Sequence, residues 1–289
     1  MKKATPMRSV HTAPLAGIFA LAMACPGPAA AQEAGPAGAI GAPAAARPAP
    51  RAGLTARAAF ETEVATLRAV MEREVPRLVA RTAADDRAWI ARTRETVAAS
   101  GQPIERPQLL VAVDRNPAVQ QLRVVAADPG GAWAVIGGTQ VSTGKPGRKE
   151  HFKTPTGVFL NTDAILGYRA QGTYNGNHIR GLGVHGMRVY DFGWQTTEDW
   201  RTRTPTMQIR LSMHATDPSV LEPRIGRPDS EGCVRLRAPM NRFLDHHGVL
   251  DASYEMAARS DGRFAALLPP DRDPSPLAGT ALVVFDSGR

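Results

Sequence analysis

The chain has 289 residues and a formal net charge of +8, with 43% hydrophobic, 21% charged and 6% aromatic residues. This composition is typical of a soluble globular domain with accessory segments, and the 27 glycines and 24 prolines favour short strands and turns over a long helical bundle. No run of basic residues is interleaved with aromatic residues, which argues against nucleic-acid binding and leaves an anionic wall or membrane surface as the expected partner.

Residues 1–31 are predicted to be a signal peptide. A positive region and a short apolar stretch precede Ala29 and Ala31, which occupy the small-residue positions before a cut ahead of Gln32. The apolar stretch is shorter than the about 20 residues of a transmembrane helix, so no membrane span is expected in the mature chain. Cleavage lowers the net charge from +8 to +5 by removing three basic residues. An exported protein, periplasmic or associated with the cell wall, is therefore predicted; lipid attachment at Cys25 is the alternative.

Two further segments precede the predicted catalytic domain. Residues 32–53 are almost entirely Ala, Gly, Pro and Arg and are expected to be a disordered linker. Residues 54–101 form a predicted helical segment with an interruption at Pro76 and a stop at Gly101. The apolar residues of its first part recur at helical spacing: Phe60, Val64, Leu67 and Met71. This helical pair is expected to cover the catalytic domain, regulate access to it, or act as a spacer.

After Pro107 the pattern changes to β-structure. Apolar runs at 109–113, 122–126 and 132–136 are separated by turns rich in Pro, Gly and Asn, which predicts an antiparallel meander. A helix is expected from Pro239 to about His246. Residues 256–289 are expected to be a C-terminal extension, in which the apolar run 282–285 closes an edge of the sheet.

The residues that indicate chemistry lie between His214 and Arg235. Cleavage of the signal peptide leaves Cys233 as the single thiol, and an unpaired thiol in an exported protein is expected to be buried or catalytic. A histidine is the natural proton acceptor for such a thiol, because its pKa lies near neutral pH. Gly232 permits an unusual backbone angle and close approach of a substrate, and leaves main-chain N–H groups to face an oxyanion.

This segment resembles the YkuD-type L,D-transpeptidase family. The family signature is a His, 14 to 17 residues, then Ser-x-Gly-Cys with an aliphatic residue and usually Arg following; here 15 residues separate His214 from Ser230, and Cys233 is followed by Val-Arg. The segment Thr-Pro-Thr-Gly at 154–157 and the Val-His-Gly at 184–186 resemble further elements of the family. The resemblance covers residues 108–255. Glu231 departs from it, since many members have His at that position and others Lys or Glu.

The resemblance implies a mainly β, α+β catalytic domain with a mixed β-sheet or sandwich and the cysteine at the mouth of a cleft. It implies acyl transfer without metal or cofactor: Cys233, deprotonated by His214, attacks a tetrapeptide stem of peptidoglycan, D-alanine leaves, and the thioester passes to an amine to form a 3→3 cross-link. Main-chain N–H groups near Gly232 and Cys233 would stabilise the oxyanions. It also implies acylation of the cysteine by carbapenem-like β-lactams.

The remaining candidate residues have two interpretations each. Arg235 is either a surface salt-bridge partner or a fork for a substrate carboxylate. Glu231 either orients the acceptor amine and tunes the thiolate, or is a solvated carboxylate. His185 lines the cleft or caps a turn, and Ser230 supports the turn. The other histidines lack partners at ligand spacing, so no metal site is predicted, and His246 and His247 are expected to be solvated.

Three rival functions remain open from the sequence. Water as acceptor would make the chain an L,D-carboxypeptidase or amidase, and the Lys of a lipoprotein would make it a protein-attaching transpeptidase. A non-catalytic wall-binding protein is the third, against which the presence of both Cys233 and His214 argues. A papain-like protease is disfavoured because there the cysteine precedes the histidine.

Overall fold

Two helices begin the computed structural model, which describes residues 50–201 and 206–288. The predicted signal peptide, Cys25 and residues 32–49 of the predicted linker lie outside the described residues. Helix α1 spans Pro50–Glu74 and α2 spans Ala83–Ser100. Both lie in the predicted helical segment, except that α1 begins four residues earlier, within the predicted linker. Thr82 caps α2 by accepting a hydrogen bond from the Asp85 amide, and Gly101 ends it with a φ of 69°.

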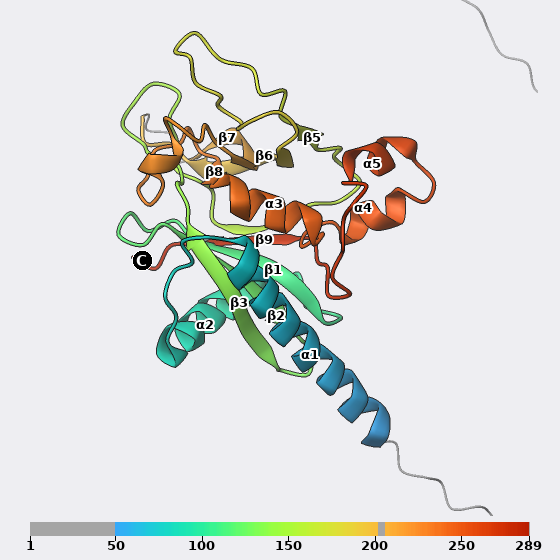
Figure 1. Ribbon diagram of the computed structural model, residues 1–289. Helices are drawn as coiled ribbons and strands as arrows, with labels where there is room; N and C mark the ends of the chain where they lie inside the picture. Colours follow the sequence, from blue (N-terminus) through green and yellow to red (C-terminus); the bar gives the residue numbers. More distant parts are fainter. Residues whose placement is uncertain (1–49, 202–205, 289) are drawn as a thin grey trace, which may run out of the picture. The chain divides into compact units, whose positions relative to one another are not determined.

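The strands form two mixed sheets, which confirms the predicted α+β class (Figure 1). Sheet A has the order β3-β2-β1-β9-β4, and sheet B the order β5-β6-β7-β8. Sheet A comprises β1 Gln108–Asp114, β2 Gln121–Ala127, β3 Trp133–Gln140, β4 Gly157–Leu160 and β9 Ala281–Phe285. Sheet B comprises β5 Tyr168–Arg169, β6 Arg188–Glu198, β7 Thr206–Ala215 and β8 Val234–Leu236. The other helices are α3 Ala238–His246, α4 Ala252–Ala257, α5 Gly262–Leu267 and the 3₁₀ turn Glu222–Arg224.

The predicted meander is confirmed, whereas the place predicted for the last strand is wrong. Strands β1, β2 and β3 pair antiparallel in sequence order. Strand β9 does not close an edge: it lies between β1, to which it is parallel, and β4, to which it is antiparallel. All five of its residues are buried, because a strand inside a sheet covered on both faces is apolar on both sides. The C-terminal residues therefore belong to the same compact unit as the segment from His214 to Arg235.

One hydrophobic core joins the two sheets. Its side chains come from one face of sheet A, one face of sheet B, α1 and α3. Helix α2 covers the opposite face of sheet A, where Trp89 packs on Val125 and Phe285, and Val97 packs on Leu110 and Val283. Of the three roles open for the helical segment, the structure shows the first: α1 and α2 cover the two faces of sheet A (Figure 1).

A buried ion pair ties β6 to the connection between α3 and α4. Arg188 Nη2 donates to Asp251 Oδ1 at 3.0 Å, and neither side chain is exposed. Asn161 Nδ2 donates to the same oxygen at 3.1 Å. The rings of Tyr190 and Tyr254 lie 5.0 and 4.9 Å from the Arg188 guanidinium, so apolar surface surrounds the pair.

Candidate active site

Strand register places Cys233 and His214 on the same face of sheet B. Along β7, Ser212 and His214 alternate with Leu211 and Met213, which are fully buried in the shared core. The parallel register of β7 and β8 pairs His214 with Arg235, and Ser212 Oγ lies 3.1 Å from Cys233 Sγ. The thiol therefore lies beside Ser212 and diagonally across from His214, on the face of sheet B opposite the core. No hydrogen bond joins the two side chains in the part of the chain that the structure describes.

The hydrogen bond of His214 fixes its tautomer. Its Nδ1 lies 2.6 Å from the carbonyl oxygen of Ala215, which can only accept, so Nδ1 carries the proton and Nε2 keeps a lone pair. Burial lowers the pKa of His214 to about 4, and the bond to Ala215 offsets part of this effect. Burial also raises the pKa of the Cys233 thiol, an effect that the hydrogen bond from Ser212 partly opposes. At neutral pH the site thus holds a neutral thiol and a neutral imidazole whose Nε2 is unprotonated.

The neutral imidazole leads to a prediction about titration. In protein labelled with ¹⁵N-histidine, the His214 signals are expected to show a neutral Nδ1–H tautomer down to pH 5 and to titrate near pH 4, because charging the buried ring is unfavourable. The unfolded chain binds this proton near pH 6.5, so acidification from there to about 4 destabilises the fold by up to about 1.4 kcal/mol per pH unit. His214→Gln identifies the signal; titration above pH 6 would contradict the expectation.

Two hydroxyl groups hold the turn before Cys233. The Ser230 hydroxyl accepts from the Gly232 amide at 3.1 Å and donates to the Cys233 carbonyl at 2.6 Å. Thr154 Oγ1 donates to the Gly232 carbonyl at 2.7 Å and accepts from the Gly144 amide at 2.9 Å. The first residue of the Thr-Pro-Thr-Gly segment therefore binds the turn directly, which explains why two motifs far apart in the sequence belong to one site.

Gly232 is required by the shape of this turn. Its φ is +139°, and a Cβ atom there would lie 2.7 Å from Cδ1 of Ile209. Of the main-chain N–H groups expected to face an oxyanion, that of Gly232 donates to Ser230 Oγ. The turn uses this amide to fix its own shape.

The other predicted residues are only partly brought together. Arg235 Nη1 donates to the Asp229 carbonyl at 2.8 Å, and its side chain is 16% exposed, so most of its guanidinium faces protein. Glu231 is exposed, and its negative charge acts to raise the pKa of both His214 and Cys233. His185 is exposed and lines a separate cavity with α3, to which neither Cys233 nor His214 contributes.

Two further histidines make contacts that the sequence did not indicate. His247 was expected to be solvated, but it is buried, and its Nε2 lies 2.9 Å from Glu74 Oε2, which ties the end of α3 to α1. His151 Nδ1 lies 3.2 Å from the Ser230 carbonyl and so contacts the turn before Cys233. Neither belongs to a metal centre: no group of His, Cys, Asp and Glu within 50–201 and 206–288 could hold a metal ion.

Sequence reasoning missed three residues on the thiol face. Ser212 contacts the thiol, and Asp191 binds Arg210 with Nη2–Oδ2 at 2.6 Å. The signal was available: from position 209 the sequence Ile-Arg-Leu-Ser-Met-His alternates apolar and polar residues, which is the period of a strand with one buried face. Extending that alternation back from His214 would have placed Ser212 and Arg210 beside it.

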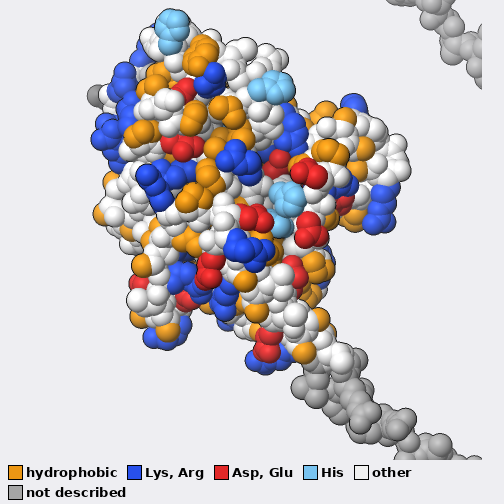
Figure 2. Space-filling view, viewed as in Figure 1, with side chains coloured by type: hydrophobic (Ala, Val, Ile, Leu, Met, Phe, Trp, Pro, Cys, Tyr) orange, Lys and Arg blue, Asp and Glu red, His pale blue; other side chains and the backbone are white. Residues whose placement is uncertain are grey.

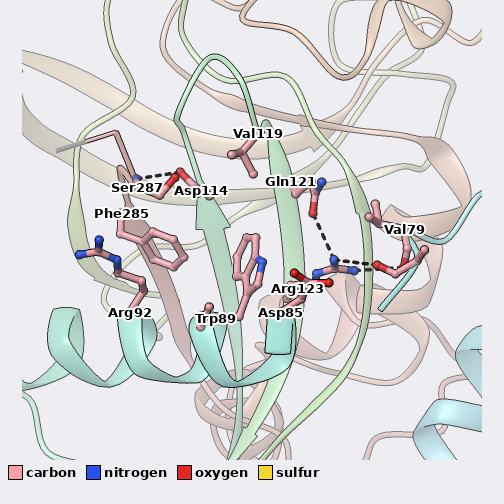
Figure 3. A pocket seen from close by; sticks show the side chains of 12 residues that line it. Val79, Asp85, Trp89, Arg92, Asp114, Val119, Gln121, Arg123, Phe285 and Ser287 are labelled. Carbon is pink, nitrogen blue, oxygen red and sulfur yellow. Dashed lines mark hydrogen bonds between the residues drawn. The ribbon is translucent and has the colours of Figure 1, made fainter. Parts of the chain in front are cut away.

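Other surface features lie away from the thiol. A cavity of about 470 Å³ lies between α2 and sheet A, where Trp89 stands between Phe285 and Arg123 (Figure 3). None of the predicted site residues lines it. Lys and Arg side chains gather along the upper left margin of the visible face, beside sheet B (Figure 2). Among the helices of the described residues, none is long and apolar enough to span a membrane.

Comparison with known proteins gives little. No family model and no curated protein matches the chain. Among solved structures, a fused Zn-dependent amidase/peptidase/peptidoglycan-binding domain-containing protein from Clostridium acetobutylicum matches at 12% identity over 71% of this chain and 63% of that chain, with a TM-score of 0.27. The chain thus spans less than two thirds of that protein, and a likeness at this TM-score supports no inference about either fold or function.

Proposed function

We propose that the chain is an exported cysteine acyltransferase of the L,D-transpeptidase type that acts on peptidoglycan stem peptides. The observation that carries the proposal is that the register of β7 and β8 puts the Cys233 thiol and the buried His214 on the same face of sheet B, with a His214 tautomer that leaves Nε2 unprotonated. The resemblance of the segment from His214 to Arg235 supplies the substrate class. The positive charge expected for the mature chain suits an anionic wall.

The proposed first half-reaction forms a thioester. Cys233 Sγ attacks the carbonyl of the third stem residue while its proton passes to His214 Nε2. The bond from that carbonyl to the nitrogen of D-alanine then breaks, and the leaving nitrogen takes the proton back from His214. Because the Gly232 amide is engaged by Ser230, we assign the oxyanion to the amide of Cys233.

The second half-reaction transfers the acyl group to an amine. The amine attacks the thioester carbonyl and gives a proton to His214, the bond from carbon to sulfur breaks, and the thiol regains that proton. An acceptor on the side chain of a second diamino acid would give a 3→3 cross-link. The step needs neither an oxidant nor a cofactor.

Incubation of the purified chain with disaccharide-tetrapeptide, followed by mass spectrometry, tests the proposal. The expected product is a dimer lighter by one D-alanine than two monomers, absent with Cys233→Ala and with Cys233→Ser. Because Cys233 is partly accessible, a carbapenem is also expected to add to it in the wild-type chain.

The other outcomes separate the rival functions. Monomer that loses D-alanine without forming a dimer would indicate hydrolysis, and product formed only when a lysine peptide is added would indicate attachment of a lipoprotein. Intact substrate together with no adduct on Cys233 would contradict the acyltransferase proposal and favour a wall-binding role.

A further inference from the structure

Arg210 lies on the thiol face of sheet B. It stands two residues before Ser212 on β7, so the two side chains emerge on the same side of the strand. Ser212 in turn contacts Cys233 Sγ at 3.1 Å. Successive side chains on one face are about 7 Å apart along a strand, which is about the length of one to two peptide residues.

Arg210 is held in place by a buried carboxylate. Its Nε and Nη2 atoms lie 2.9 and 2.6 Å from Asp191 Oδ2, and the Gly193 amide donates to Asp191 Oδ1 at 2.9 Å. The side chain of Asp191 is 5% exposed, whereas that of Arg210 is 51% exposed. Asp191 therefore serves as a positioning residue, and the outer edge of the guanidinium faces solvent.

The exposed edge of Arg210 has unused donors. Hydrogen bonds are made by Nε and Nη2 only, so Nη1 has no partner among the described residues. A guanidinium presents paired donors in a plane that matches a carboxylate. Tyr168 borders the same space, and its side chain is half exposed. The charges of Asp191 and Cys233 raise the pKa of its phenol, whereas that of Arg210 lowers it.

Arg235, which the sequence offered for the same task, is less available. Its guanidinium donates to the Asp229 carbonyl, and its side chain is 16% exposed, against 51% for Arg210. A carboxylate near the thiol would therefore meet the open edge of Arg210 more readily than the enclosed group of Arg235.

We propose that Arg210, oriented by Asp191, binds the free α-carboxylate of the residue that leaves when Cys233 attacks its acyl donor. The inference rests on the proposed function and deepens it: the donor class is a peptide whose scissile bond precedes its last residue. An amidated or extended peptide cannot present this carboxylate at the same place, so Arg210 selects the carboxyl end.

The test compares two donors, the disaccharide-tetrapeptide and the same molecule with a C-terminal carboxamide. The wild-type chain is expected to favour the acid in kcat/KM, and Arg210→Ala to lower kcat/KM for the acid roughly 10- to 100-fold while changing that for the amide less than about threefold. Arg210→Lys and Asp191→Asn are expected to lose part of the preference. Arg263→Ala is the matched control, since Arg263 forms an exposed pair with Asp261 on α5. An unchanged acid-to-amide ratio in Arg210→Ala overturns the inference.

A second readout keeps the two proposals separable. Alkylation of Cys233 by N-iodoacetylglycine and by its amide needs no transpeptidase activity, and the acid places a carboxylate one residue from the thiol. We expect Arg210→Ala to lower the acid-to-amide rate ratio about fivefold or more. If no peptide is turned over but this ratio falls, the proposed function fails while carboxylate binding by Arg210 stands; an unchanged ratio overturns Arg210 as the carboxylate site.

Discussion

Replacement of His214 by glutamine is expected to lower the rate of acylation of Cys233 by its peptide donor about 10²- to 10⁴-fold, the usual contribution of a general base. The imidazole Nε2 is the lone pair that the tautomer leaves for the thiol proton. The side-chain amide nitrogen of glutamine can donate a hydrogen bond, but it cannot accept the thiol proton. Because burial raises the pKa of Cys233, little thiolate exists at neutral pH to compensate for the missing base.

The rate is measured as acyl-enzyme formed over time, by mass spectrometry of the intact protein. His246→Gln is the matched control, because His246 lies on α3 and lines a cavity to which neither Cys233 nor His214 contributes. A His214→Gln variant that retains acylation within tenfold of the wild-type rate, with an unchanged fold, would show that another group takes the proton.

Replacement of Asp251 by alanine is expected to lower the free energy of unfolding by about 3–5 kcal/mol, because it leaves the Arg188 guanidinium buried without its charge partner. The guanidinium cannot lose its charge at ordinary pH, its side chain is fully buried, and two tyrosine rings flank it. Burial raises the pKa of Asp251 to about 6, an effect that Arg188 partly opposes. Unfolding by urea should therefore be measured near pH 8, where the carboxylate is charged.

Two variants serve as controls for this effect. Asp261→Ala breaks the exposed pair with Arg263 and is expected to cost less than about 1 kcal/mol. The double replacement Arg188→Met with Asp251→Leu removes both charges and is expected to be markedly more stable than Asp251→Ala. A loss below 1 kcal/mol for Asp251→Ala alone would mean that water reaches the guanidinium in the folded protein.

The local parts of the fold could be predicted from the sequence. Periodic apolar residues indicated α1 and α2, Gly101 marked the end of α2, and turn residues marked the β1–β3 meander. These signals depend on neighbours in sequence. The position of β9 does not, because it is fixed by pairing with β1. Its unbroken apolar sequence was the available sign of an interior strand.

The two reactive residues of the candidate site could be predicted from the sequence, but the contacts that hold them in place could not. A histidine and a cysteine at the spacing of His214 and Cys233 indicated the pair. The bond from His214 to Ala215 depends on how β7 ends, and the contact of Thr154 with Gly232 joins segments 78 residues apart. The pairing of Asp191 with Arg210 depends on the register of β6 against β7, which no local pattern indicates.

The interior place of β9 has a consequence for the order of assembly. Strand β4 reaches the meander only through β9, so a chain that is still emerging, whether from the ribosome or across a membrane, lacks the partner that β4 needs. Thr154 lies three residues before β4 and holds the turn before Cys233 through Gly232. We therefore expect the thiol of Cys233 to acquire its final geometry only in the last folding step, after the C-terminal strand β9 has docked.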